Sequence, residues 1–154
     1  MLCFTDLGEP KISQLENPSW ISGGYTVPDN FHNSLYNNTT GYNNIAIGKK
    51  TLHSNTSGYW NTAIGNDALE ENTTGYGNTA IGEDALEANT TGNQNVAIGA
   101  FSLQTNTTGY RNTSIGRNAM EYNTTGYGNS ATGAYALRFN TTGIDNTAEG
   151  FASL

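Results

Sequence analysis

The sequence predicts an all-β fold, a parallel β-solenoid, and three observations support it. The string Asn-Thr-Thr-Gly, with Ser once in its third place, occurs seven times at a constant interval of 17 residues, first at Asn38 and last at Asn140. Seventeen residues are too few for a repeated helix pair, which takes more than about 30. Charged residues make up only 12% of the chain, and 19 of its 154 residues are Gly. A strict period at such low charge indicates stacked, ordered coils.

Each repeat, counted from its first Asn as place 1, predicts one circuit of the solenoid. Places 7 to 11, most often Asn-Thr-Ala-Ile-Gly, predict a strand of about five residues that ends at a Gly corner. Places 14 to 17, as in Ala-Leu-Glu-Glu, are too short for a stable helix and predict a shorter strand or an irregular side with Leu inward. Places 1 to 4 predict a tight return in which Gly supplies a positive φ.

Stacking predicts which columns of residues hold the coils together. Coils about 4.8 Å apart put equivalent residues over one another, so seven coils form a rod of roughly 35 Å. The Ile of place 10 and the Leu or Met of place 15 are predicted to form the core: Ile47, Ile64, Ile81, Ile98, Ile115, Leu52, Leu69, Leu86, Leu103, Met120 and Leu137.

The invariant Asn of places 1 and 7 are predicted to form amide ladders, because stacked side-chain amides satisfy one another inside a thin solenoid. The ladder of place 7 consists of Asn44, Asn61, Asn78, Asn95, Asn112, Asn129 and Asn146.

One coil contains little apolar surface, and this favours assembly of several chains. The entropy lost on ordering a coil is large compared with the burial of one Ile and one Leu. Three stacks bundled together would bury their small-residue faces as well. We therefore expect a homotrimer.

The sequence divides into an N-terminal cap or attachment segment, residues 1–37, and the solenoid domain, residues 38–154. All three prolines and the only cysteine lie in the first segment. Because solenoid ends need covering, it is expected to cap the first coil or to dock the rod on a larger assembly. Trp20, Tyr25 and Phe31 are the candidate attachment residues.

The last two coils depart from the pattern. Thr132 and Glu149 replace the Ile of place 10, and a buried Glu149 would be costly unless paired or protonated. Aromatic or aliphatic residues take places that are mostly polar earlier, and they are expected to form an apolar tip against symmetry mates: Phe139, Ile144 and Phe151.

Composition and motifs argue against several functions. A net charge of −7 disfavours nucleic-acid binding. No nucleophile, P-loop or zinc motif occurs, so we expect no catalytic residue, no cofactor and no metal site, and no enzyme activity. No run of residues approaches the length of a membrane helix, and residues 1–10 do not resemble a secretory signal.

An aromatic column at place 5 is the clearest candidate contact surface. It could stack on sugar rings, or pack at a subunit interface or against itself. Thr columns at places 2 and 3 suggest ice binding only weakly, because adjacent strand residues face opposite sides. The aromatic column consists of Tyr42, Tyr59, Tyr76, Tyr110 and Tyr127.

The unit Asn-Thr-Ala-Ile-Gly, with its variants Asn-Ile-Ala-Ile-Gly, Asn-Val-Ala-Ile-Gly and Asn-Thr-Ser-Ile-Gly, resembles the head repeats of trimeric autotransporter adhesins. Similar repeats occur in fibre and spike proteins of phages. The resemblance covers residues 38–154 and implies a trimer of left-handed β-rolls that attaches to a host surface. The 17-residue period and the Asn-Thr-Thr-Gly-Tyr insertion depart from the adhesin pattern, and we expect neither a signal peptide nor a coiled-coil stalk.

The resulting functional prediction is a virion surface protein, a phage fibre, spike or capsid decoration. Its first 37 residues would bind other virion proteins, and its rod would contact a host-surface glycan or protein. The alternative is the head of a bacterial adhesin at the cell surface. A tailspike glycan hydrolase is a more distant possibility, for which the sequence offers no site.

Overall fold

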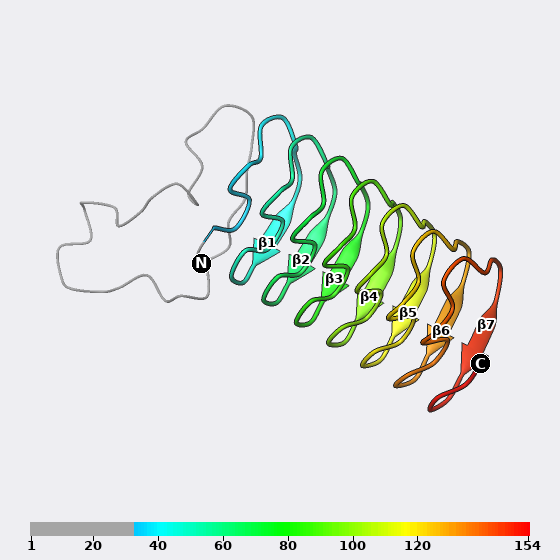
Figure 1. Cartoon of the computed structure of the whole chain (residues 1–154). Helices are drawn as coiled ribbons and strands as arrows, with labels where there is room; N and C mark the ends of the chain where they lie inside the picture. Colours follow the sequence, from blue (N-terminus) through cyan, green and yellow to red (C-terminus); the bar gives the residue numbers. More distant parts are fainter. Residues whose placement is uncertain (1–32) are drawn as a thin grey trace, which may run out of the picture.

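The computed structural model describes residues 33–154 as a regular stack of coils (Figure 1). Seven short strands form one parallel sheet in sequence order, which confirms the all-β parallel solenoid. The candidate attachment residues Trp20, Tyr25 and Phe31 lie outside the described residues. The strands are β1 (Ile45–Ile47), β2 (Thr62–Ile64), β3 (Thr79–Ile81), β4 (Val96–Ile98), β5 (Thr113–Ile115), β6 (Ser130–Thr132) and β7 (Thr147–Glu149).

The register of the sheet follows the repeat. Ala63 pairs with Ala80, and Ala80 with Ala97, so every residue lies over its equivalent 17 positions later. Each strand has three residues, fewer than the five expected, because the chain turns at the Gly of place 11. Gly65 has a φ of 137°, a value that L side chains rarely adopt. A Cβ there would overlap the backbone carbonyl of Gly82, so only glycine fits this corner.

The core differs from the prediction at one column. The Leu and Met of place 15 from Leu52 to Leu137 are buried as expected, with Leu137 at 8% exposure, whereas Leu154 in the last coil is 91% exposed. The prediction that the Ile of place 10 form the core is wrong. Ile47 and Ile64 are half-buried, and the other three are 37% to 39% exposed: Ile81, Ile98 and Ile115.

The Ala of place 9 occupies the interior instead. Ala63, Ala80 and Ala97 have no exposed surface. In a three-residue strand the middle side chain points away from the other two. Since the coil is too thin for a large residue here, Ala turns inward, and places 8 and 10 turn outward together.

Both Asn ladders are confirmed. In the place-7 ladder, the Asn78 backbone N–H and Nδ2 both donate to Asn61 Oδ1, at 3.0 and 3.2 Å. In the place-1 ladder, Asn72 Nδ2 donates to Asn55 Oδ1 at 2.8 Å. These side chains are fully buried in the central coils. Each amide therefore makes with the coils above and below the hydrogen bonds that it can no longer make with water.

The Gly of place 4 has a different role from the one expected. The positive-φ glycines lie at places 6 and 11, and Gly75 is not among them. A Cβ on Gly75 would overlap Asn72 Oδ1 and the carbonyl of Gly92. Glycine is needed at place 4 because the coils approach closely there, and because its carbonyl accepts from the ladder amides.

Left-handed backbone is nevertheless common at non-glycine positions. Places 6, 13 and 15 take a positive φ in nearly every coil, as in Trp60 (56°), Asp67 (53°) and Leu69 (52°). Each costs an L residue about 1–2 kcal/mol. At place 15 the conformation points Leu into the core, where burial offsets the cost.

A few contacts between coils do not repeat. Ser102 and Ser114 replace small apolar residues of neighbouring coils, and their buried hydroxyls bond at 2.8 Å. Lys50 forms an ion pair with Glu70 at 2.9 Å. These pairs are specific to one position in the stack.

The described solenoid begins before residue 38. Leu35 is fully buried in the Leu column, and its N–H donates to the Thr51 carbonyl at 3.0 Å. At the other end, Glu149 is exposed because place 10 faces outward. The expected apolar tip is exposed as well: Phe139 (67%), Ile144 (48%) and Phe151 (77%).

Candidate functional site

The outer side of the sheet is the first candidate surface, and we call it the sheet face. It contains the two outward columns of the strands, at places 8 and 10. From β1 to β5 the second column is uninterrupted Ile, and the first contains only Ile, Thr or Val. Thr132 and Glu149 end the Ile column at β6 and β7. This narrow strip of β-branched side chains carries no charge over five coils.

The Tyr column of place 5 forms a second surface, which we call the aromatic ridge together with the neighbouring residues of place 6. Tyr42, Tyr59 and Tyr76 stack with centroids 5.0 Å apart and nearly parallel planes. Tyr110 and Tyr127 stack at 4.7 Å. The rings therefore cover one another, as in the alternative in which the column packs against itself.

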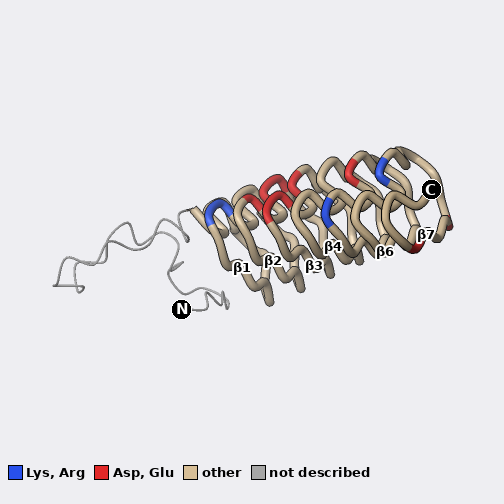
Figure 2. Tube along the Cα trace, turned by 90° about the horizontal axis from the view of Figure 1, so that it is seen from below, with Lys and Arg blue, Asp and Glu red and all other residues tan. Residues whose placement is uncertain are grey.

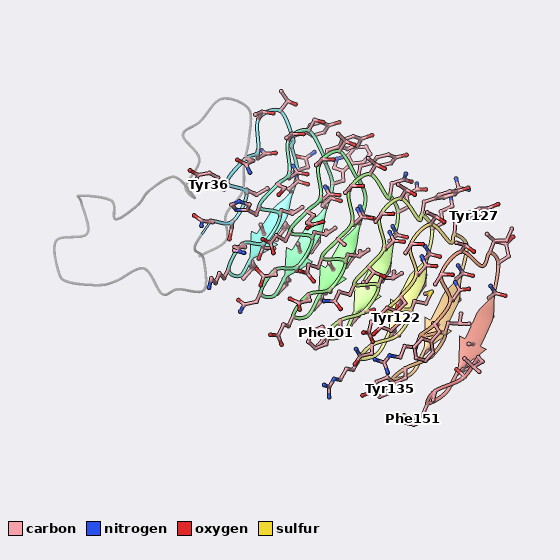
Figure 3. The ribbon with its side chains drawn as sticks, in the orientation of Figure 1. Tyr36, Phe101, Tyr122, Tyr127, Tyr135 and Phe151 are labelled. Atoms are coloured by element: carbon pink, nitrogen blue, oxygen red, sulfur yellow. The ribbon has the colours of Figure 1, made fainter. Side chains whose placement is uncertain are left out.

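The ridge lies at one end of the flattened coil. Tyr127 marks this end in Figure 3, and Phe101, Tyr135 and Phe151 lie at the opposite end. The sequence prediction did not single out Trp60, which is 59% exposed on the ridge. Its place in the repeat varies freely, and only its being the single tryptophan of the repeats could have drawn attention to it.

Acidic residues gather over the coils of β2 and β3 (Figure 2). Burial and the neighbouring Glu87 raise the pKa of Asp84 to about 6. Burial and Glu70 likewise raise the pKa of Asp67, whose Oδ1 has no hydrogen-bond partner. Lys50 balances part of this charge through Glu70.

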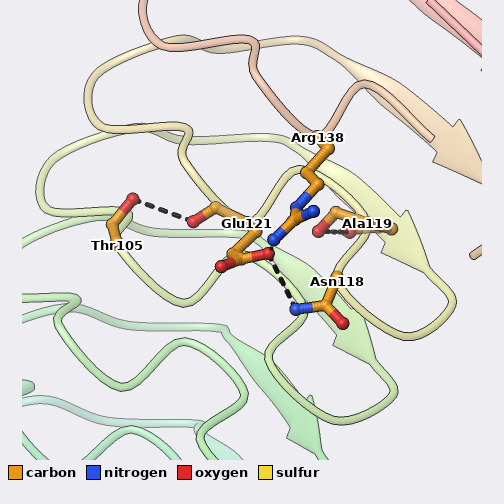
Figure 4. Close-up of polar contacts among 6 residues, drawn as sticks. Thr105, Asn118, Ala119, Glu121 and Arg138 are labelled. Carbon is orange, nitrogen blue, oxygen red and sulfur yellow. Dashed lines mark hydrogen bonds and ion pairs between the residues drawn. The ribbon is translucent and has the colours of Figure 1, made fainter. Parts of the chain in front are cut away.

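A cluster around Arg138 ties the later coils together (Figure 4). Arg138 Nε donates to Glu121 Oε2 at 2.7 Å, and Asn118 Nδ2 donates to the same oxygen at 2.7 Å. Burial alone would raise the pKa of Glu121, but the hydrogen bonds from Arg138, Tyr122 and Asn118 lower it below its ordinary value. The guanidinium also lies 5.2 Å from the Tyr135 ring centroid. All its groups are engaged with one another, so the cluster serves packing.

Within 33–154, no group of three or more His, Cys, Asp or Glu is arranged to hold a metal ion. His53 stacks on Tyr36 at 5.3 Å and faces the Asn33 carbonyl. In the same range, no helix has the length and apolarity needed to cross a bilayer.

These features define a class of protein, a repeat solenoid with a regular interior and variable outward positions. No family model, curated protein or solved structure matches the chain. The sheet face and the aromatic ridge are therefore the features on which a function can be argued.

Proposed function

We propose that the protein is a non-enzymatic display protein, a homotrimeric fibre, spike or capsid-surface component of a virion. The observation that supports this best is the sheet face, an uncharged strip of Ile, Val and Thr side chains from β1 to β5 in which Ile81, Ile98 and Ile115 are 37% to 39% exposed. Exposed strips of this kind mark interaction surfaces. The chain is otherwise polar, with a mean hydropathy of −0.53, so the strip is not a by-product of general hydrophobicity.

The coil itself suits display. Inward places hold Asn, Ala, Leu and Gly in nearly every repeat, whereas places 6, 12, 13, 16 and 17 differ from coil to coil. The inward residues make a stiff rod, and the outward residues can vary without disturbing it. Weak contacts repeated along a rod, and again on three rods, add up through multivalency.

The width of the sheet face supports a three-fold assembly. Two side-chain columns form a narrow ridge, and three ridges can meet along one axis. Two broad sheets packed face to face would instead call for a wide apolar face. Glu149 would lie near the axis of such a trimer, where three carboxylates repel one another, so the protomers would separate at β7.

Static light scattering tests the assembly. We expect a mass of three times 16.4 kDa. The double substitution Ile81→Glu with Ile98→Glu should give folded monomers, because it places charge in the strip. Thr74→Glu with Thr91→Glu, which adds the same charge at two exposed positions outside the sheet face, should remain trimeric. A wild-type monomer at micromolar concentration would refute both the fibre and the adhesin proposals.

The head of a bacterial trimeric autotransporter adhesin is the second candidate, because Asn-Thr-Ala-Ile-Gly resembles the repeats of that family. The two candidates share an assembly and differ in genetic setting. Neighbouring capsid or tail genes would support the virion protein, whereas a secretion or membrane-anchor gene would support the adhesin.

A further inference from the structure

Trp60 on the aromatic ridge has a position that folding does not account for. Its side chain is 59% exposed, and its φ of 56° is unfavourable for a bulky residue. Place 6 takes a positive φ in every coil from residue 38 on, both at Asn43, Gly77 and Gly128, which accept it readily, and at Gln94 and Arg111, which are as strained as Trp60. The fold therefore accounts for the φ but not for the choice of an exposed tryptophan, which suggests a contact with something outside the protomer.

The geometry fixes how the indole lies. Both faces of Tyr59 are covered by Tyr42 and Tyr76, so Trp60 must meet the edge of Tyr59. The two planes are 77° apart and the centroids 5.1 Å apart, as in an edge-to-face contact. Because the tyrosines stack along the rod, the indole plane runs parallel to the rod. The edges of Tyr42 and Tyr59 cover part of the indole, and 59% of the residue stays exposed to solvent.

In the next coil along the rod Gly77 leaves open space beside the indole, and the two coils after it present the polar side chains of Gln94 and Arg111. A Cβ on Gly77 would meet nothing closer than Gln94 Cγ at 3.7 Å. The equivalent space at Gly128, by contrast, is filled by the Asp145 carboxylate. Gln94 Oε1 accepts from Arg111 Nε at 3.1 Å, so the amide is held in a fixed orientation.

We propose that this strip, formed by Trp60, Gly77, Gln94 and Arg111 in four successive coils, binds a linear chain of pyranose sugars lying along the rod. The electron-rich face of an indole attracts the C–H groups of a pyranose ring. The amide and the guanidinium donate hydrogen bonds to sugar oxygens, and the amide can also accept them.

Spacing and composition support the same ligand. Coils lie about 4.8 Å apart, close to the length of one sugar unit in an extended β-linked chain, so successive sugars meet successive coils. The open space over Gly77 admits a unit between the platform and the amide. The place-5 residue of the Gln94 coil is Asn93 where most coils have Tyr, which makes this part of the ridge more polar.

The proposal names a ligand class for the attachment function proposed above and rests on that function for its biological setting. The chain has two tryptophans, Trp20 and Trp60. In the variant Trp20→Phe, tryptophan fluorescence therefore comes from Trp60 alone and reports on the strip directly. Cellotetraose and chitotetraose have flat, β-linked chains. Titration with either should change the tryptophan emission to saturation, with a dissociation constant of about 1 mM. Maltotetraose, whose α-linked chain curves, should bind more weakly.

Three matched substitutions to Asn locate the site by calorimetry. Trp60→Asn removes the platform and should weaken binding at least about tenfold. Gly77→Asn keeps an acceptable residue at φ 65° and obstructs the middle of the strip, so it should weaken binding similarly. Phe101→Asn changes an aromatic residue of similar φ, 60°, at the other end of the coil, and should leave the affinity unchanged.

Two results would overturn the proposal: no saturable change with any of the three sugars up to about 10 mM, or unchanged affinity in Trp60→Asn. Circular dichroism confirms that each variant is folded. A trimer that binds no sugar would refute the glycan site alone. A monomer that binds sugar would refute the proposed assembly and leave the site standing.

Discussion

Replacing Asn78 by Ala tests how much the buried amide ladder contributes to stability. The substitution removes the Nδ2 bonds to Asn61 Oδ1 at 3.2 Å and to the Gly92 carbonyl at 2.9 Å. It also removes the acceptor of the Asn95 backbone N–H, at 3.0 Å, and of Asn95 Nδ2, at 3.2 Å. The orphaned buried N–H costs about 1–3 kcal/mol, and each of the three lost side-chain bonds about 0.5–1.5 kcal/mol. The free energy of unfolding should therefore fall by about 2.5–7.5 kcal/mol.

The same substitution at Asn146 is the matched control. Asn146 donates to Asn129 Oδ1 in the same way, but it is exposed in the last coil. Water can replace its bonds, so we expect a loss of about 1 kcal/mol or less. Urea unfolding followed by circular dichroism, at one protein concentration, gives both values. Equal losses at the two positions would refute the reasoning, because the cost is argued from burial.

Gly65→Ala should abolish cooperative unfolding and the β-sheet circular dichroism, since its Cβ overlaps the next coil's carbonyl; a melt like that of the wild type would contradict this. Burial, followed by the charge of Glu87, raises the pKa of Asp84 in the folded protein from 3.8 to about 6. The protonated carboxyl therefore favours the folded state at low pH, and this stabilisation is lost as the pH rises from about 4 to about 6. Asp84→Asn should therefore raise the urea midpoint at pH 7.5 and leave it unchanged near pH 4, whereas equal effects at both pH values would refute the shift. In the monomeric Ile81→Glu, Ile98→Glu background, Leu103→Ala should lower the free energy of unfolding by about 2–5 kcal/mol and Ile115→Ala by less than about 1 kcal/mol, as measured by urea unfolding. The reverse order would place Ile in the core.

The period alone was enough to predict the architecture. A fixed interval of 17 residues requires equivalent residues to stack, and the parallel register and both Asn ladders follow from that. The Leu column could also be predicted, because place 15 is large and apolar in every repeat.

The core assignment of Ile failed for a reason that was visible in the sequence. Place 9 is Ala in six repeats and Ser114 in the other, which indicates a space too small for a larger side chain. Place 10 tolerates Thr132 and Glu149, as an outward position does. Apolar character alone favours Ile inside, whereas the alternation of a three-residue strand with Ala inward turns Ile outward.

The candidate contact surface could be predicted only in part. The Tyr column was evident from its spacing, but its self-stacking depends on ring geometry that composition does not determine. Trp60 and Gly77 stand at a place that varies from coil to coil, so the period carries no information about them. Their significance comes from which neighbours the stacking brings together.

Because the coils are nearly identical, the chain can stack them in a wrong register during folding. Each coil presents the same Asn, Ala and Leu side chains to the next coil. A stacking register shifted by one whole repeat of 17 residues therefore preserves most interior contacts. Only the few non-repeating pairs, such as Ser102 with Ser114 and Lys50 with Glu70, distinguish the correct register from its neighbours. The same edges would accept a coil from another molecule, so domain-swapped chains compete with correct folding at high concentration.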